Sequence, residues 1–181
     1  MNPPESEHAH TENLMGALAL VIADRTADAI EDSSRQSPTA AAALSALHQF
    51  LGTPSIDLLR QVLGLTSSGT VRLVDRLEDP GYVTRRTGSD GRLTLIQLTA
   101  SGRRAASRVS SARSSVLREA LSVLSPDERR TLDAIAARLL VGLMRGPGAV
   151  RWMCRLCDVT ACGRDQGRCP VAAAASSTET S

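Results

Sequence analysis

The spacing of apolar residues along the chain predicts a mainly helical protein. Over residues 12–34, apolar positions recur every three or four residues, which indicates a long amphipathic helix. Two shorter helices are expected over 39–51 and 53–63, and a glycine follows each of them. A further helix is expected over 67–78, because Thr66 is a good N-terminal cap.

A change of period follows these helices. Two short alternating runs, 82–86 and 92–98, flank the turn-forming residues 88–91 and predict a β-hairpin. Because helices dominate and the hairpin is small, the expected fold class is mainly α (α+β).

Two long helices are predicted after the hairpin. Thr99 caps the first, which runs to about residue 124. The run Ser125-Pro126-Asp127-Glu128 has the form of a capping box with proline at the first helical position. It starts a last amphipathic helix, which the glycines of 146–148 end.

The order helix, turn, helix, hairpin is typical of a winged helix-turn-helix, whose second helix lies in the major groove of DNA. On the 67–78 helix we expect Val71, Val74 and Leu77 to pack inward. Small residues at a helix start allow close approach to phosphates, and an arginine at a hairpin tip is placed to enter a minor groove. The candidate DNA contacts are small or basic: Ser67, Ser68, Gly69, Thr70, Arg72, Arg76, Arg85, Arg86 and Arg92.

Charge supports this interpretation only through its distribution. The formal net charge of +2 is too small to establish a polyanionic partner. Residues 55–104, however, hold eight arginines against five acidic residues. All basic residues of the chain are arginine, which suits bidentate recognition of phosphate and guanine, although a coding bias explains the absence of lysine equally well.

Motifs of matching order and spacing run from the first helix to the last. They are Leu63-Gly64-Leu65-Thr66, the run 71–78, Gly81-Tyr82-Val83, Asp90-Gly91-Arg92, Leu98-Thr99-x-x-Gly102-Arg103 and the run 124–129. In these motifs the chain resembles the multiple-antibiotic-resistance regulator (MarR) family. The resemblance implies a regulator, most often a repressor, and not an enzyme. It also implies a homodimer, with the first and last helices as dimerisation helices and two wings on palindromic double-stranded operator DNA. By the same resemblance Arg92 is the wing-tip arginine. The sequence does not identify a small-molecule effector.

All four cysteines lie close together near the C-terminus, as Cys154-x2-Cys157-x4-Cys162-x6-Cys169. Four thiolates in sixteen residues, interleaved with arginines, indicate a metal site. Small buried hydrophobic residues and disulfides are the alternatives. The graded spacing and Cys169-Pro170 favour an iron–sulfur cluster, such as [4Fe–4S], slightly over Zn²⁺. We expect Trp152 to shield one side of this site.

Two roles for the cysteine site remain open. The first is metal or redox sensing that alters the dimer and its affinity for DNA, and the second is a structural clip. Two other protein classes are alternatives to the regulator. They are a redox or electron-transfer protein that uses the cysteines, and a winged-helix module that binds protein.

The sequence divides into four segments. We expect a disordered arm over 1–11, the winged-helix domain over 12–146, the cysteine-rich segment over 147–170 and a disordered tail over 171–181. The first residues lack the pattern of a secretory signal, and no run of about 18 apolar residues is present. A cytoplasmic protein without membrane contact is therefore expected.

Overall fold

The computed structural model describes residues 3–88, 91, 93–146 and 148–178, and nine α-helices and two strands lie in these ranges. In chain order the elements are α1 (Pro3–Ser34), α2 (Pro38–Ala46), the π-helix η1 (Leu47–Leu51), α3 (Ile56–Leu63), α4 (Ser67–Glu78), β1 (Val83–Thr87), β2 (Thr94–Leu98), α5 (Ala100–Leu121), α6 (Pro126–Gly142), α7 (Ala149–Met153), α8 (Val159–Cys162), the 3₁₀ turn η2 (Arg164–Gln166) and α9 (Pro170–Thr178). Within these ranges no helix is long and apolar enough to cross a membrane.

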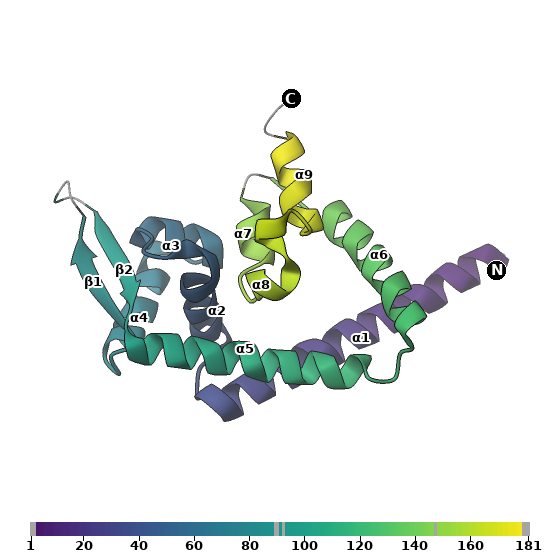
Figure 1. Cartoon of the computed structure of the whole chain (residues 1–181), viewed down its shortest axis with the longest axis horizontal. Coiled ribbons are helices and arrows are strands. Elements are labelled where there is room, and N and C mark those ends of the chain that lie inside the picture. Colours follow the sequence, from purple (N-terminus) through teal and green to yellow (C-terminus); the bar gives the residue numbers. More distant parts are fainter. Residues whose placement is uncertain (1–2, 89–90, 92, 147, 179–181) are drawn as a thin grey trace.

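One compact domain, named the reading domain because the sequence predicts that it reads DNA, occupies one end of the molecule (Figure 1). It consists of α2, η1, α3, α4 and the β1–β2 hairpin. Its core contains alanines of α2 and the fully buried Leu44, Leu59, Leu73 and Ile96. The antiparallel hairpin, in which Val83 pairs with Leu98 and Thr87 with Thr94, projects from this core as the wing. The winged helix-turn-helix order expected from the sequence is confirmed.

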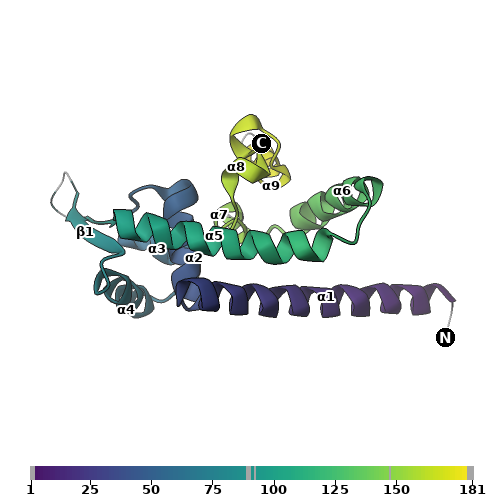
Figure 2. The same ribbon diagram turned by 60° about the horizontal axis from the view of Figure 1, so that its bottom comes forward.

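Two long helices extend from the reading domain. α1 and α5 lie side by side and antiparallel, and the N-terminal part of α1 projects beyond α5 (Figure 2). Arg25 of α1 pairs with Glu119 of α5 at 2.8 Å, and Ile30 packs with Ala41 and Val109. These two helices form an arm that carries the reading domain at one end.

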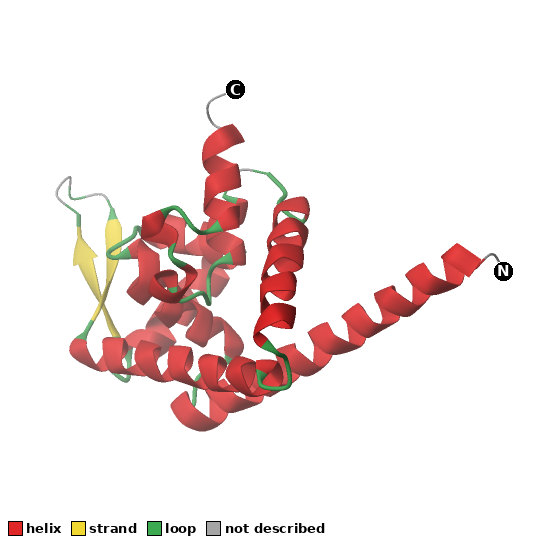
Figure 3. Cartoon of the chain, turned by 45° about the vertical axis from the view of Figure 1, so that its right-hand side comes forward, coloured by secondary structure: helices red, strands yellow, loops and turns green. Residues whose placement is uncertain are grey.

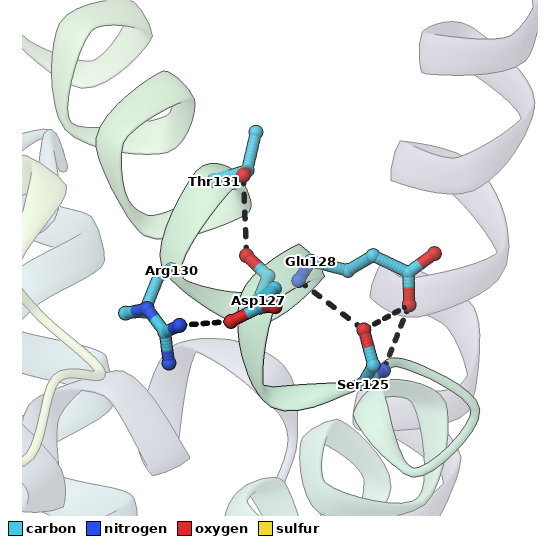
Figure 4. Close-up of polar contacts among 5 residues, drawn as sticks. All are labelled: Ser125, Asp127, Glu128, Arg130 and Thr131. Carbon is cyan, nitrogen blue, oxygen red and sulfur yellow. Dashed lines mark hydrogen bonds and ion pairs between the residues drawn. The ribbon is translucent and has the colours of Figure 1, made fainter.

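α6 leaves the end of α5 through the predicted capping box (Figure 4). The Ser125 hydroxyl accepts from the Glu128 backbone N–H at 3.4 Å. In return the Glu128 carboxylate accepts from the Ser125 backbone N–H at 2.8 Å, so both exposed backbone groups are satisfied. No residue of α6 is buried, and its apolar side chains are exposed.

The cysteine-rich segment folds into a small helical unit, α7 to α9, which returns toward the reading domain (Figures 1 and 3). α9 packs on α6, and α7 packs on α3. Cys154, Cys169 and Val171 form its buried centre. The unit thus lies between the last long helix and the helix-turn-helix.

Two terminal predictions differ from the structure. α1 begins at Pro3, whereas disorder was expected over 1–11; proline is tolerated in the first turn of a helix, so the two prolines do not delay its start. α9 runs to Thr178, whereas a disordered tail was expected over 171–181. Pro170 is suited to a helix start, alanine favours the helix, and the buried Val171 anchors α9.

Candidate nucleic-acid interface and cysteine cluster

The reading helix α4 begins at Thr66, whose hydroxyl accepts from the Gly69 backbone N–H at 3.1 Å. A Cβ on Gly69 would lie 3.0 Å from that hydroxyl, so a small residue suits this turn. The bounds of the helix, Ser67–Glu78, are those predicted from the cap. Small side chains therefore surround an N-terminus whose amide groups point outward.

The buried face of α4 differs from the predicted one. Thr70, Leu73, Val74 and Leu77 are buried, whereas Val71 is 44% exposed. The i, i+3, i+4, i+7 pattern that begins at Thr70 defines this face, and a threonine was not counted as a core residue.

Thr70 is therefore a correction to the candidate DNA contacts. Its side chain is 1% exposed, and its hydroxyl donates to the Thr66 carbonyl at 2.9 Å. The other candidates on α4 that carry side chains, Ser67, Ser68, Arg72 and Arg76, are exposed, and Gly69 is half-buried.

The two arginines of β1 have different surroundings. Arg85 is half-buried, and its guanidinium pairs with Glu78 and, at 2.5 Å, with Asp75 of α4. Its backbone N–H also donates to Glu78 at 3.0 Å. Partial burial lowers the pKa of Arg85, but the hydrogen bond to Asp75 and the charge of Glu78 together outweigh burial and raise the pKa above its usual value. The guanidinium therefore stays charged. Arg85 joins the wing to the reading helix, while Arg86 is exposed.

Only part of the wing tip lies within the described residues. Arg92, the predicted wing-tip residue, lies outside the described residues, as do Ser89 and Asp90. Gly88 and Leu93 close the described part of the hairpin, since the Gly88 N–H donates to the Leu93 carbonyl at 2.8 Å.

The structure adds two residues that the sequence analysis missed. Arg35 and Ser37 line a pocket with Arg76 of α4, in front of the start of α2. Arg35 adopts the left-handed φ of 54° directly after α1. Ser37 caps α2 at 3.4 Å, and the Ser37-Pro38 pair was a detectable helix-start signal. A second helix N-terminus with an arginine thus lies next to α4.

The four cysteines lie in one cluster and are free thiols. Cys154 and Cys169 are buried, whereas Cys157 and Cys162 are half-buried. The thiols interact chiefly as two pairs, Cys154 with Cys157 and Cys162 with Cys169. The cysteines far apart in the chain are therefore brought together as the sequence predicted.

These pairs shift the acidity of the thiols. The bond to Cys154 and the charges of Arg113 and Arg164 lower the pKa of Cys157 to about 6, against the opposing effect of burial. The bond to Cys157 and burial raise the pKa of Cys154. Burial and the bond to Cys169 raise the pKa of Cys162 to about 11.

Two observations bear on whether the cysteine cluster fits a metal centre, and they point in opposite directions. Among the described residues, no group of three or more His, Cys, Asp or Glu side chains is spaced to hold a metal ion. On the other side, Nη1 of Arg164 is buried without a hydrogen-bond partner in the described part of the chain. The charge of Arg164 acts on three of the four thiols, so the cluster contains a cationic group suited to an anionic thiolate centre.

Trp152 was predicted to shield the cysteine site, but in the structure it faces another part of the protein. Trp152 is 51% exposed, and the Arg155 guanidinium lies 4.7 Å from its ring centroid. Its Nε1 lies 4.0 Å from the Cβ position of Gly64, at the turn between α3 and α4. Trp152 therefore faces the helix-turn-helix, because α7 packs on α3.

Comparison with known proteins gives a consistent assignment. The sequence model of the MarR family matches residues 37–93, which hold α2, η1, α3, α4 and β1. No curated protein matches. A MarR family protein from Bacillus stearothermophilus is 26% identical, with 80% of this chain and 99% of that one covered and a TM-score of 0.69. A probable transcriptional regulator from Pseudomonas aeruginosa is 27% identical, with 69% and 96% covered and a TM-score of 0.55.

A third structure shows the fold bound to a nucleic acid. A MarR family transcriptional regulator from Streptomyces coelicolor, in complex with DNA, is 18% identical to this chain. The similarity covers 82% of this chain and 94% of that one, with a TM-score of 0.63. The sequence model of the MarR family thus matches the region from α2 through β1, and over most of its length the chain is similar in fold to winged-helix proteins of the MarR family.

Proposed function

We propose that the protein binds palindromic operator DNA as a homodimer and represses transcription. The exposed face of α4, small at its N-terminus and basic at Arg72 and Arg76, carries this proposal. Small residues and outward-pointing amides suit close approach to the DNA, and the two arginines suit guanine edges or phosphates. Arg86 on the wing and Arg35 beside α2 extend the basic surface to both sides.

Dimerisation is supported by apolar surface that a single chain leaves exposed. On α1, Leu14, Leu18 and Val21 are each more than half exposed, and they recur at helical spacing. On α6 and at its C-terminal cap, Ile135, Leu139 and Leu143 are 47%, 45% and 65% exposed and also recur at helical spacing. Burial of one such side chain stabilises an interface by about 1.5–3 kcal/mol, so a second copy of the chain is the natural occupant of these faces.

Binding to DNA and dimerisation are tested together. Purified protein is titrated against labelled duplex DNA from upstream of its own gene, at several salt concentrations, and its mass is measured by light scattering. We expect a dimer whose affinity falls steeply with salt, because arginines displace counterions from phosphates. Arg72→Ala should weaken binding, while Arg130→Ala on α6, where the arginine pairs with Asp127, is the matched control. A monomer, or binding without salt dependence, would contradict the proposal.

Repression is tested separately, in a purified transcription reaction. Added protein should reduce transcription from a promoter that carries the bound site, and Arg72→Ala protein should not. An increase in transcription would instead identify an activator.

We also propose that the four cysteines bind a thiolate-ligated metal centre. We favour an iron–sulfur cluster, and Zn²⁺ is the alternative. The support is the convergence of the thiols and the unpartnered Arg164 Nη1 among them. Bound there, either centre supplies a compact group that cross-links all four thiolates. The thiols of the described structure would have to draw closer to hold a single ion.

Anaerobic purification followed by visible absorption and Zn and Fe analysis tests this part. A brown protein with broad visible absorption identifies a cluster, and a colourless protein with one zinc per chain identifies the alternative. A variant with all four cysteines changed to serine is the control and should retain neither metal. If the unaltered protein holds no more metal than this variant, the metal proposal is wrong.

A further inference from the structure

The cysteine-rich unit contacts the DNA-reading domain directly. The Val159 backbone N–H, at the start of α8, donates to Oε1 of Gln49 in η1 at 3.1 Å, across 110 residues of chain. The Arg164 guanidinium lies 5.6 Å from the ring centroid of Phe50, the next residue of η1. Trp152 of α7 faces the turn at Gly64. Contact is therefore made at two places, η1 and the helix-turn-helix turn.

Each of these contacts lies within three residues of a cysteine. Trp152 precedes Cys154 by two residues, while Val159 and Arg164 flank Cys162. Arg164 also acts electrostatically on three of the thiols while it covers Phe50. A change in how the thiols are held can thus reach the reading domain across only two or three residues of chain.

The two contact points lead to the two elements that read DNA. After η1 the chain turns at Gly52, and the Pro54 carbonyl accepts from the Ile96 N–H of the wing at 2.9 Å. Ser55 forms a β-bridge with Leu95 of the same strand. Gly64, at the second contact point, is followed two residues later by Thr66, the cap of α4. η1 is therefore continuous with the wing, and the turn is continuous with the reading helix.

η1 itself is an uncommon element. π-helical turns are rare and occur frequently at functional sites. Here α2 passes into five π-helical residues, and two consecutive ones, Gln49 and Phe50, contact the cysteine-rich unit. Their neighbour His48 is exposed. The contact is thus confined to one side of η1.

We propose that loading of the four-cysteine site with metal changes operator affinity through the contacts of Gln49 and Phe50 with α8 and Arg164. The proposal rests on the metal site and DNA binding proposed above, and it adds the route between them. With metal bound, the four thiols would be held closer together, and α8 and Arg164, which adjoin Cys162, would carry that change to η1 and the wing. The dimer helices α1 and α6 are not part of this route.

The test compares operator affinity in two states of the same protein. Reduced protein is stripped of metal with a chelator, and half is reloaded with Zn²⁺ as the probe metal. The measured quantity is the ratio of the two dissociation constants for operator DNA. In the unaltered protein we expect a ratio of fivefold or more, the lower end of typical allosteric coupling.

Two variants then separate the route from the site. Gln49→Met removes the acceptor for Val159, and Phe50→Leu removes the ring beneath Arg164, each with little change of volume. In either variant the ratio should fall toward one, and in the double variant to within about twofold, with Zn²⁺ uptake retained. His48→Ala, in the same π-helix but on the exposed side, should keep the full ratio. Trp152 is the only tryptophan, so its emission reports movement at the second contact on reloading.

The outcomes are distinct. A ratio that persists in the double variant overturns this inference and assigns the coupling to another route, while the proposed function stands. A ratio of one in the unaltered protein, with Zn²⁺ bound, also overturns it and leaves a structural clip. Failure of the unaltered protein to bind operator DNA refutes the proposed function itself. Failure to bind Zn²⁺ overturns this inference, while the iron–sulfur proposal keeps its own spectroscopic test.

Discussion

Gly102 offers a sharp test of how the wing is fixed to the long helix α5. It lies in the first turn of α5, where its N–H donates to the Thr99 hydroxyl at 3.0 Å. A Cβ at this position would lie 2.0 Å from the carbonyl oxygen of Tyr82 and 2.8 Å from Cδ2 of Leu98. The backbone of α5 and the start of the wing therefore approach closely enough to exclude every side chain.

The size of the effect follows from opposing contributions. Gly102→Ala gains up to about 1 kcal/mol from helix propensity. The new methyl must retreat by more than about 1 Å, since carbon and oxygen meet at about 3.3 Å. Overpacking of this kind costs about 1–3 kcal/mol. The Tyr82 carbonyl also accepts from the Thr99 N–H at 3.0 Å and the Thr99 hydroxyl at 3.2 Å. Loss of each bond costs about 0.5–1.5 kcal/mol, so the contributions together leave a net loss of about 1–5 kcal/mol.

Gly16→Ala is the matched control. Gly16 lies inside α1, and no heavy atom lies within 4 Å of its Cβ position. The same chemical change there should stabilise the protein by up to about 1 kcal/mol. Equilibrium urea unfolding of both variants, at equal protein concentration, measures the two free energies of unfolding. If Gly102→Ala is as stable as the unaltered protein, or gains as much as Gly16→Ala, the close approach of α5 and Tyr82 is wrong.

Five further substitutions test the wing, helix α4 and the capping box of α6. Arg85→Ala should lower both the free energy of unfolding, by about 1–2 kcal/mol, and operator affinity, because the wing loses its ion pairs to α4. Arg86→Ala should lower affinity alone and reduce the salt slope by about one; equal effects in both arginine variants would refute the distinction. Arg72→Ala should cost about 1–3 kcal/mol of operator affinity with unchanged thermal unfolding, and a fall in melting temperature would show a packing role instead. Ser125→Ala should destabilise the protein by about 0.5–2 kcal/mol in thermal unfolding. Hydrogen bonds from Ser125 lower the pKa of Glu128 below 4.5, so the carboxylate's contribution is complete above pH 4.5 and is lost as pH falls through the lower folded value. The melting temperature of Glu128→Gln should therefore depend less on pH below 4.5, and an unchanged dependence would contradict this.

Local signals predicted the elements that they control directly. The Thr66 cap gave both bounds of α4 together with Pro80-Gly81, and the capping box at Ser125 located the start of α6. These interactions span three or four residues, so they can be read from the sequence. The alternation of apolar and polar residues likewise predicted the hairpin.

Features that depend on distant contacts were not predictable in this way. Arg85 has the residue type expected of a DNA contact, but it pairs instead with Asp75 and Glu78, which lie on another element. Thr70 is buried because α4 packs through it, which a hydrophobic pattern does not record. The helices α7 to α9 are short, and they are held by the cysteine cluster and by α6 rather than by their own amphipathic faces.

The position of the cysteine-rich unit also bears on how a dimer would respond. α6 has no buried residue within one chain and packs chiefly on α9, while α7 at the other end of the unit packs on α3. A partner that covers the apolar face of α6 would therefore hold α9 from one side, and DNA that engages α4 would hold α3 from the other. The four thiols lie between these two attachments, so tightening of the cluster must move one end or the other. Because a dimer interface of many apolar side chains would resist displacement more than one hydrogen bond, one ring contact and the short packing of α7 on α3, we expect the movement to fall on η1 and the reading domain.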